Sequence, residues 1–463
     1  MITILLILAL LELARAHVHG HIHGGHTRFY NSFPTSLSAL STSIPVTTAL
    51  PALGSSPVVG SSLIANLSAT NSSSATPTAT SLYAPKSFRH PGLLQTADDF
   101  ERIRTNLAAG AQPWTLAWNK LLESGYASPM YEPNPAPTIY RGSDGVHAEN
   151  YAQLYDDIAA AYVLSICYAI SQNRTYGDAA VRIMDAWSST LVALGGDTDV
   201  FLAAGIYGYE FAQAGEIMRD YESWPAENFT RFQNMMTEVF YSTVNSWFEQ
   251  HENWGSYASS VYSNWDLCQI ASAMSIGVLT DNQTIYNRGI GWFYNGTGNG
   301  QINEAIPYTH WYDDQLIGQT QESGRDQGHG TLVIALLSVI GQTGYHQGND
   351  LFAYNGSAIL AAAEYTARYN LGYDAPYTPY DHWPLVLPSI SNGSRGDQRP
   401  NWELLWNHYG VLKGQNTTWT KKFRDLVVSN NGGAEGGSGD YGSDSGGYDQ
   451  LGWGTLLYTL TSS

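Results

Sequence analysis

Few side chains in this sequence carry a charge. Asp, Glu, Lys and Arg together make up 13% of the 463 residues, about half the usual share. The net charge is −19, which argues against nucleic acid or an anionic membrane as a partner. The two cysteines, Cys167 and Cys268, are too few for a disulfide scaffold, so they either form one bridge or remain buried thiols.

Aromatic residues are abundant instead. The chain has 31 tyrosines and 14 tryptophans, and 43% of its residues are hydrophobic, which is enough to bury a large core. Few charges combined with many aromatic and amide side chains is a frequent composition in secreted carbohydrate-active proteins, where rings stack on sugars and amides bond hydroxyls. The composition therefore favours a protein that acts on or binds glycans.

A hydrophobic run opens the chain. MITILLILALLELARA (1–16) ends in an A-x-A pattern and is too short for a membrane span, so it predicts a signal peptide. We therefore expect a secreted, extracellular glycoprotein with no membrane partner, either released or retained at a cell wall. Nine N-x-S/T sequons support a secretory route: Asn66, Asn71, Asn173, Asn228, Asn282, Asn295, Asn355, Asn392 and Asn416.

The segments after the predicted cleavage site have a biased composition. The His-rich leader (17–33) begins HVHGHIHGGH and is either a solvated leader or a copper-binding segment, in which His19 would join the free amino terminus. Residues 34–83 are rich in Ser, Thr, Ala and Pro and predict a disordered linker. We expect the folded domain to span 84–463 and to be a monomer.

The folded region has a mostly helical pattern, with apolar and aromatic residues at three-to-four spacing. Short Gly/Asn loops join successive segments, which predicts antiparallel helical hairpins arranged as an inner and an outer ring. The sequence therefore predicts an all-α toroid. The expected helices cover 147–171, 178–194, 201–218, 227–248, 264–280, 331–344 and 357–372.

Several stretches resemble one known group of enzymes. ESGRDQGH (322–329) is the most specific of them, and the others are DGVHAENYAQLYDDIAAAY (144–162), NWG (253–255), NWDLCQIASAMSIGV (264–278), AEYTARYNLGYDAPYTPY (363–380) and RPNWELLWNHY (399–409). Over roughly 85–460 the chain resembles the alginate-lyase-like superfamily, and most closely the secreted members of polysaccharide lyase family 38.

The resemblance implies an incomplete (α/α) toroid with an open groove. It also implies β-elimination on uronic-acid polysaccharides of the alginate or glucuronan type, and such a mechanism requires no cofactor or metal. The better-known family 5 alginate lyases carry Asn-His where this chain has Asn264-Trp265. That departure removes one expected histidine.

Eliminating a 4-linked uronate requires neutralisation of the C6 carboxylate, a base for the C5 proton and an acid for the departing O4. Glu322, Arg325 and His329 would share one face of a helix, although the glycines between them equally allow a loop that enters a helix at Thr331. As the resemblance implies, we predict that His329 is the base and that Glu322 binds the substrate carboxylate or orients the site. Arg325 is either part of the site or a structural ion-pair partner of Glu322 or Asp326.

The acid is predicted to be a tyrosine from another segment. Tyr380 is favoured because its Pro-rich surroundings indicate a loop, where catalytic groups are often displayed. Tyr377 and Tyr409 remain alternatives. Asn264 is either a ligand for the C6 carboxylate or a helix cap, and Arg399 is a candidate carboxylate clamp. Further residues predicted to bind substrate are His147, Asn150, Tyr151, Trp254 and Trp265.

Two other functions remain open. An inverting glycoside hydrolase would need two carboxylates about 6.5–9.5 Å apart, which could come from Asp156-Asp157, Asp313-Asp314, Glu322 and Asp326. A non-catalytic glycan-binding protein would not need the acid, arginine and histidine of 322–329. The charge of −19 would repel a polyanion, and only 21 Lys and Arg residues are available to build a basic groove.

Overall fold

The computed structural model describes residues 83–254, 260–382, 385–437, 439, 441 and 448–460. The predicted signal peptide, the His-rich leader and nearly all of the predicted linker lie outside these residues, as does the side chain of Trp254. The described residues fall within one compact unit, Ala79–Ser463.

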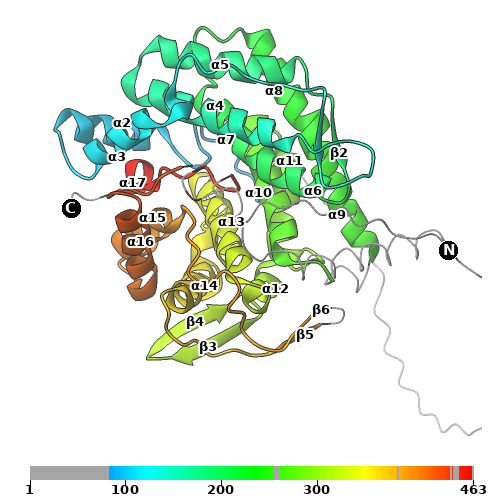
Figure 1. Cartoon of the computed structure of the whole chain (residues 1–463), viewed down its shortest axis with the longest axis vertical. Helices are drawn as coiled ribbons and strands as arrows, with labels where there is room; N and C mark the ends of the chain where they lie inside the picture. Colours follow the sequence, from blue (N-terminus) through cyan, green and yellow to red (C-terminus); the bar gives the residue numbers. More distant parts are fainter. Residues whose placement is uncertain are drawn as a thin grey trace, which may run out of the picture. The chain divides into compact units, whose positions relative to one another are not determined.

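Helices make up most of this unit (Figure 1). Among the described residues, η3 (Ala203–Tyr207), η4 (Met236–Tyr241) and η8 (Trp406–Leu412) are π-helical, and η2 (Gly125–Ala127), η6 (Gln321–Gly324) and η7 (Leu351–Ala353) are 3₁₀ turns. The α-helices are α2 (Ala97–Ala108), α3 (Trp114–Glu123), α4 (Tyr151–Ser171), α5 (Arg174–Ser188), α6 (Val200–Leu202), α7 (Gly208–Ile217), α8 (Ala226–Met235), α9 (Ser242–Trp254), α10 (Ser263–Leu279), α11 (Gln283–Asn295), α12 (Ile302–Ala305), α13 (Gln327–His346), α14 (Tyr354–Asn370), α15 (Trp402–Leu405), α16 (Thr418–Asn430) and α17 (Gly454–Tyr458).

The helices form an inner and an outer layer. Inner helices α4, α7, α10 and α13 pack each against the next, and α5, α11 and α14 cover them from outside (Figure 1). The inner helices are apolar on most sides, and every residue of α10 except Trp265 is buried. The predicted all-α toroid of antiparallel hairpins is confirmed, because helices with no polar face can be stable only inside a second layer.

The N-terminal ends of the inner helices converge. Arg141, just before α4, donates from Nη1 to the Tyr207 hydroxyl at the start of α7 (3.0 Å). At the next pair of helices, the backbone N–H of Asn264 in α10 donates to Glu322, just before α13 (2.7 Å). Contacts of this kind require the helix starts to share one face of the ring, which we call the N-terminal face.

Helix α13 begins earlier than the sequence predicts. We expected Thr331 to open it, because Gly328 and Gly330 disfavour a helix. The Asp326 side chain instead caps the helix by accepting the backbone N–H of His329 (2.8 Å), so both glycines lie in the first turn. His329 is thereby fixed on a helix rather than in a loop.

In the part of the chain that the structure describes, the strands form three two-stranded sheets. Strands β1 (Thr138–Arg141) and β2 (Ala193–Gly196) are parallel, whereas β3 (Tyr308–Tyr312) with β4 (Gln315–Gln319), and β5 (Tyr380–His382) with β6 (Leu385–Leu387), are antiparallel hairpins. Asp313 and Asp314 both have positive φ and form the β3–β4 turn. Cys167 and Cys268 are free, buried thiols.

Helix α4 is long and apolar enough to cross a bilayer by length and composition alone. Yet 78% of its most apolar window is buried inside the fold, as is usual for the core helix of a globular domain. Its sequence is thus explained by its inner position in the ring.

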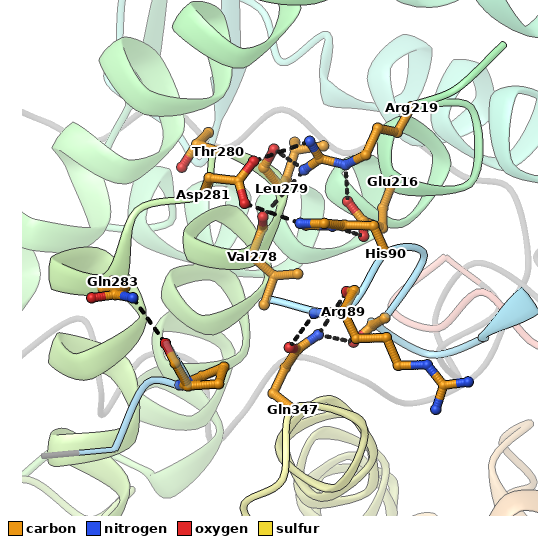
Figure 2. A network of polar contacts seen from close by, with 12 residues as sticks. Arg89, His90, Glu216, Arg219, Val278, Leu279, Thr280, Asp281, Gln283 and Gln347 are labelled. Carbon is orange, nitrogen blue, oxygen red and sulfur yellow. Dashed lines mark hydrogen bonds and ion pairs between the residues drawn. The ribbon is translucent and has the colours of Figure 1, made fainter. Parts of the chain in front are cut away.

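The segment that leads into α2 is pinned across the ends of several helices. Gln347 accepts the backbone N–H of Arg89 (3.0 Å) and donates to the carbonyl of Gly92 (2.7 Å). Figure 2 shows His90 between Glu216 (2.6 Å) and Asp281 (3.0 Å), with Arg219 bound to the same two carboxylates. Burial opposes the charged imidazole, but the hydrogen bond and charge of Glu216 raise the pKa of His90 above its ordinary value.

This network predicts a pH-dependent contribution to stability. A raised histidine pKa stabilises the fold below the unfolded-state pKa, and that contribution is lost as the pH rises through the folded-state pKa. We expect His90→Gln to lower the free energy of unfolding more at about pH 5 than at about pH 8. Hydrogen bonds to charged groups contribute roughly 1.5–3 kcal/mol, which bounds the effect. Urea unfolding of both proteins at the two pH values tests this, and equal losses at both would contradict it.

Candidate active site

The carboxylate of Glu322 is at the centre of the most polar cluster on the N-terminal face. It is 0% exposed. One oxygen accepts from the Ser263 hydroxyl (3.1 Å) and the backbone N–H of Asn264 (2.7 Å), and the other accepts from the Asn264 side-chain amide (3.0 Å) and from Arg325 (3.0 Å). Since all four interactions are internal, Glu322 holds the start of α10 and the guanidinium of Arg325 in place. The orienting role is therefore the one that its surroundings favour.

Arg325 lies between this buried carboxylate and an aromatic ring. Its guanidinium carbon is 4.0 Å from the centroid of the Tyr262 ring, and its Nε is 3.8 Å from Asp326. Tyr262 is half-buried, and burial raises the pKa of its hydroxyl although the Arg325 charge opposes the shift. Tyr262 is therefore a protonated phenol at neutral pH.

His329 has the geometry of a general base. Its Nδ1 is 2.6 Å from the Asp326 carboxylate, and 36% of its side chain is exposed. When Nδ1 carries the proton and donates it to Asp326, Nε2 keeps its lone pair for an incoming proton. Asp326 and His329 thus form an acid–histidine pair in the first turn of α13.

Asp326 stays ionised over the whole working range of pH. Burial would raise its pKa, but the hydrogen bond and charge of His329, with the backbone N–H of that residue and the charge of Arg325, lower it to about 2. A permanently charged Asp326 fixes the tautomer of His329 and stabilises the imidazolium that forms when a proton is taken.

The three tyrosines proposed from the sequence have different surroundings. Tyr380 is 0% exposed and donates to Asn299 (3.2 Å), and Tyr409 is buried and donates to the carbonyl of Phe352 (2.9 Å). Tyr377 is half-buried and donates to the carbonyl of Leu387 (2.9 Å). Each hydroxyl therefore already has an internal acceptor.

The residues proposed to bind substrate separate into two groups. Asn264 is buried in the Glu322 cluster, and Trp265 lies beside it on α10, half-buried and stacked on Trp247 (ring centroids 5.7 Å apart). Arg399 contacts the first turn of α13, donating from Nε to the carbonyl of Gly328 (3.1 Å). These three lie on the N-terminal face together with Arg325 and His329.

The second group lies before α4. Asn150 accepts the backbone N–H of Tyr140 (2.7 Å) and donates to the carbonyl of Thr138 (3.0 Å), so it joins β1 to the helix start. His147 stacks on Tyr140 (4.1 Å) and bonds Asp144 (2.7 Å) in an exposed loop. The contacts of both residues are with the segment that precedes α4.

Sequence reasoning missed two residues of this face. Tyr262 immediately precedes the first residue of α10, and a scan for residues just before polar helix starts would have found it. Arg141 lies with its guanidinium 5.2 Å from the Tyr151 ring and 5.4 Å from the Tyr207 ring. Burial opposes its charge, but the nearby Tyr207 and Asp449 raise its pKa.

Positive groups on this face lie beside carboxylates. Each helix N-terminus carries a partial positive charge of about 0.5, and Arg325 and Arg399 pair with Glu322 and Asp449. An anionic ligand would therefore be attracted by the helix N-termini and by the part of Arg325 that is exposed, within a chain whose net charge is −19.

Within the described residues, the side chains of the site contain no group of three or more His, Cys, Asp or Glu that could hold a metal ion. The paired carboxylates considered for hydrolysis are engaged elsewhere. Asp156 accepts from Tyr126, and Asp157 accepts from Tyr131 (2.8 Å) and Trp187 (2.6 Å).

Solved structures of alginate lyases resemble this fold. A variant of alginate lyase A1-III in complex with a tetrasaccharide has a TM-score of 0.54 at 14% identity, over 82% of this chain and 98% of that one. Alginate lyase A1-III from Sphingomonas species A1 gives 0.52 at 15% identity, over 81% and 98%. At this identity the likeness shows the fold. A search of curated proteins found no match.

The family itself is shown by the sequence. The profile described as "Alginate lyase" matches residues 120–375, which is more than half of the chain and includes Tyr262, Glu322 and the Asp326–His329 pair. The chain therefore belongs to the alginate lyase family and is a polysaccharide lyase.

Proposed function

We propose that this enzyme cleaves 4-linked uronic-acid polysaccharides, of the alginate or glucuronan type, by β-elimination. The observation that carries the proposal is the Asp326–His329 pair, with its free Nε2, beside a guanidinium that is held by a buried carboxylate. The tetrasaccharide complex of the structurally similar alginate lyase supports a polysaccharide substrate on this fold.

The first half of the reaction is removal of the C5 proton. The C6 carboxylate of the substrate pairs with Arg325, whose charge, with the positive end of α13, stabilises the enolate that develops. His329 Nε2 takes the proton, and Asp326 stabilises the resulting imidazolium. Glu322 does not touch the substrate in this scheme and acts as a positioning residue for Arg325 and Asn264.

The second half is departure of O4. The C5–H electron pair forms the C4=C5 double bond, the C4–O4 bond breaks, and O4 takes a proton from an acid. We assign this role to Tyr262, because it is half-buried on the N-terminal face and its ring lies against the guanidinium of Arg325 (4.0 Å). The products are an unsaturated uronate on one fragment and a free hydroxyl on the other. His329 then releases its proton to solvent, and solvent returns a proton to Tyr262.

The Tyr262 assignment has a direct test. We expect Tyr262→Phe to lower kcat by about 10²–10³-fold with little change in KM, since a general acid typically contributes 10²–10⁴-fold. The phenyl ring still supports Arg325, so the fold should be retained. Tyr380→Phe is the matched control and should lose only one hydrogen bond, at a cost of about 1 kcal/mol. A large loss of kcat in Tyr380→Phe, with no loss in Tyr262→Phe, would assign the role of the general acid to Tyr380 instead.

The substrate class is tested by ultraviolet absorbance of the unsaturated product. The protein is incubated without added metal with polymannuronate, polyguluronate and glucuronan. Rising absorbance on one polymer, absent in His329→Ala, would name the substrate. New reducing ends without a rise in absorbance would contradict β-elimination. If neither absorbance nor reducing ends increase and the polymer still binds, the result would favour a glycan-binding protein.

We also propose that the enzyme is secreted and N-glycosylated. The predicted signal peptide and the sequons support this, and the sequon asparagines Asn173, Asn282, Asn295, Asn355, Asn392 and Asn416 are exposed. Asn228 differs, because its amide donates to Asp185 (2.7 Å). Sequencing of the mature amino terminus and a mass loss on treatment with a peptide N-glycosidase would test both parts.

A further inference from the structure

Residues 448–453, which we call the crossing segment, lead into α17 (red in Figure 1). At one end, the Tyr448 ring stacks on Tyr155 of α4, with centroids 4.0 Å apart and planes at 29°. The backbone carbonyl of Asp449 then accepts the hydroxyl of Tyr209 from α7 (2.6 Å). The segment is therefore attached to the first two inner helices.

Arg399 continues this line of contacts to the catalytic helix. Its Nη1 is 3.2 Å from the Asp449 carboxylate, and its Nε donates to the carbonyl of Gly328 (3.1 Å). Gly328 directly precedes His329. An unbroken series of contacts thus runs from α4 to α13 through Tyr155, Tyr448, Asp449, Arg399 and Gly328. Arg399 is only 3% exposed.

The crossing segment is held in place by backbone contacts with the rest of the fold, so we describe it as a wall and not as a mobile lid. Trp453 donates its backbone N–H to the carbonyl of Gly436 (2.8 Å). Gly452 has a φ of +72°, and a Cβ there would lie 2.2 Å from the same carbonyl, so only glycine fits this close approach. The cavity beneath the segment, lined by Tyr209, Ala335 and Leu451 among others, has a volume of about 20 Å³, enough for one water and too small for a sugar.

The crossing segment also carries a negative charge that would repel a uronate. Asp449 is 22% exposed in its side chain, and its negative charge lies near Tyr207 and Glu210. A substrate carboxylate that approached this point would face a like charge. The residues 448–453 and Arg399 lie outside the 120–375 range that the family profile matches.

We propose that the crossing segment ends the substrate path beside His329, so that a polyuronate chain reaches the base from one side only and is cleaved close to its end. The enzyme would then be exolytic, releasing short unsaturated products. This inference rests on the proposed β-elimination at His329.

Product size and viscosity test the inference. Wild-type enzyme acts on the polymer that yields unsaturated product, and solution viscosity is compared with absorbance at equal extents of cleavage. We expect only short oligosaccharides and a slow fall in viscosity. Tyr448→Gly, which removes the ring on Tyr155, should release longer products and raise the viscosity loss per bond cleaved several-fold. Asp449→Asn, which keeps a hydrogen-bond acceptor for Arg399 and removes the charge, should shift the profile in the same direction.

Tyr373→Gly is the matched control, because it removes an exposed ring that contacts Trp419 outside the crossing segment (ring centroids 4.7 Å apart, planes at 57°). Its product profile should equal that of the wild type. Long products and an early collapse of viscosity in the wild type would overturn the inference while leaving β-elimination intact, and so would an unchanged profile in folded Tyr448→Gly and Asp449→Asn. Failure of every polymer to give unsaturated product would instead overturn the proposed function, and the inference with it.

Discussion

His329→Ala is expected to lower kcat by about 10²–10⁴-fold, the usual contribution of a general base. The side chain is partly exposed and, among the described residues, hydrogen-bonds Asp326, so its removal should leave the fold intact. Binding of the polymer should persist, because Arg325 and the helix N-termini remain. Steady-state kinetics on the unsaturated product, with thermal unfolding measured in parallel, checks both statements.

Asp326→Asn tests the same pair while His329 stays in place. Asparagine caps a helix about as well as aspartate, so the first turn of α13 should hold. The neutral amide can no longer favour Nδ1–H on His329 or stabilise the imidazolium, so kcat should fall although the base is present. Full activity in Asp326→Asn would show that the pair does not work as a unit, and full activity in His329→Ala would exclude His329 as the base.

Glu322→Ala is expected to be the most destabilising single change in the site, at about 3–5 kcal/mol, the range found when one partner of a buried ion pair is removed. The change leaves Arg325 without its closest counter-ion and takes an acceptor from Ser263 and from two donors of Asn264. Activity should fall with stability, because Arg325 loses its orientation. Urea unfolding measures the first effect and residual turnover at low temperature the second.

The chain contains a matched control for this ion pair. Glu101 and Arg104 have the same i, i+3 spacing and a distance of 2.8 Å, but Glu101 is 69% exposed in its side chain. Exposed pairs contribute at most about 1 kcal/mol, so Glu101→Ala should have little effect. Similar losses in both variants would contradict the view that burial makes Glu322 important.

Periodicity in the sequence predicted the fold because the inner helices have no polar face. Segments such as 264–280 and 331–344 are apolar all round, which only a two-layer helical arrangement explains, and α10 and α13 lie where this pattern places them. The short strands were not predicted, because sequences such as ALGG (193–196) carry too few alternating residues to indicate a strand.

The candidate site was harder to predict, because its members come from distant segments. The spacing of Glu322, Arg325 and His329 indicated a cluster, but only the structure separates the buried Glu322 from the partly exposed His329. Tyrosines are so numerous that sequence alone could not show which one lies against Arg325, and Tyr262 was not considered. Its contact depends on how α10 and α13 pack, which is information that no local pattern contains.

The mass of the products tests the central claim most directly. Elimination adds no water to the polymer, so the masses of the two fragments sum to the mass of the chain that was cleaved. One of the two new ends carries an unsaturated uronate. Mass spectrometry of the oligosaccharides released by the wild-type enzyme should therefore show such water-free ends, and none from His329→Ala. Fragments that have each gained the elements of water across the broken bond would show hydrolysis and contradict the account.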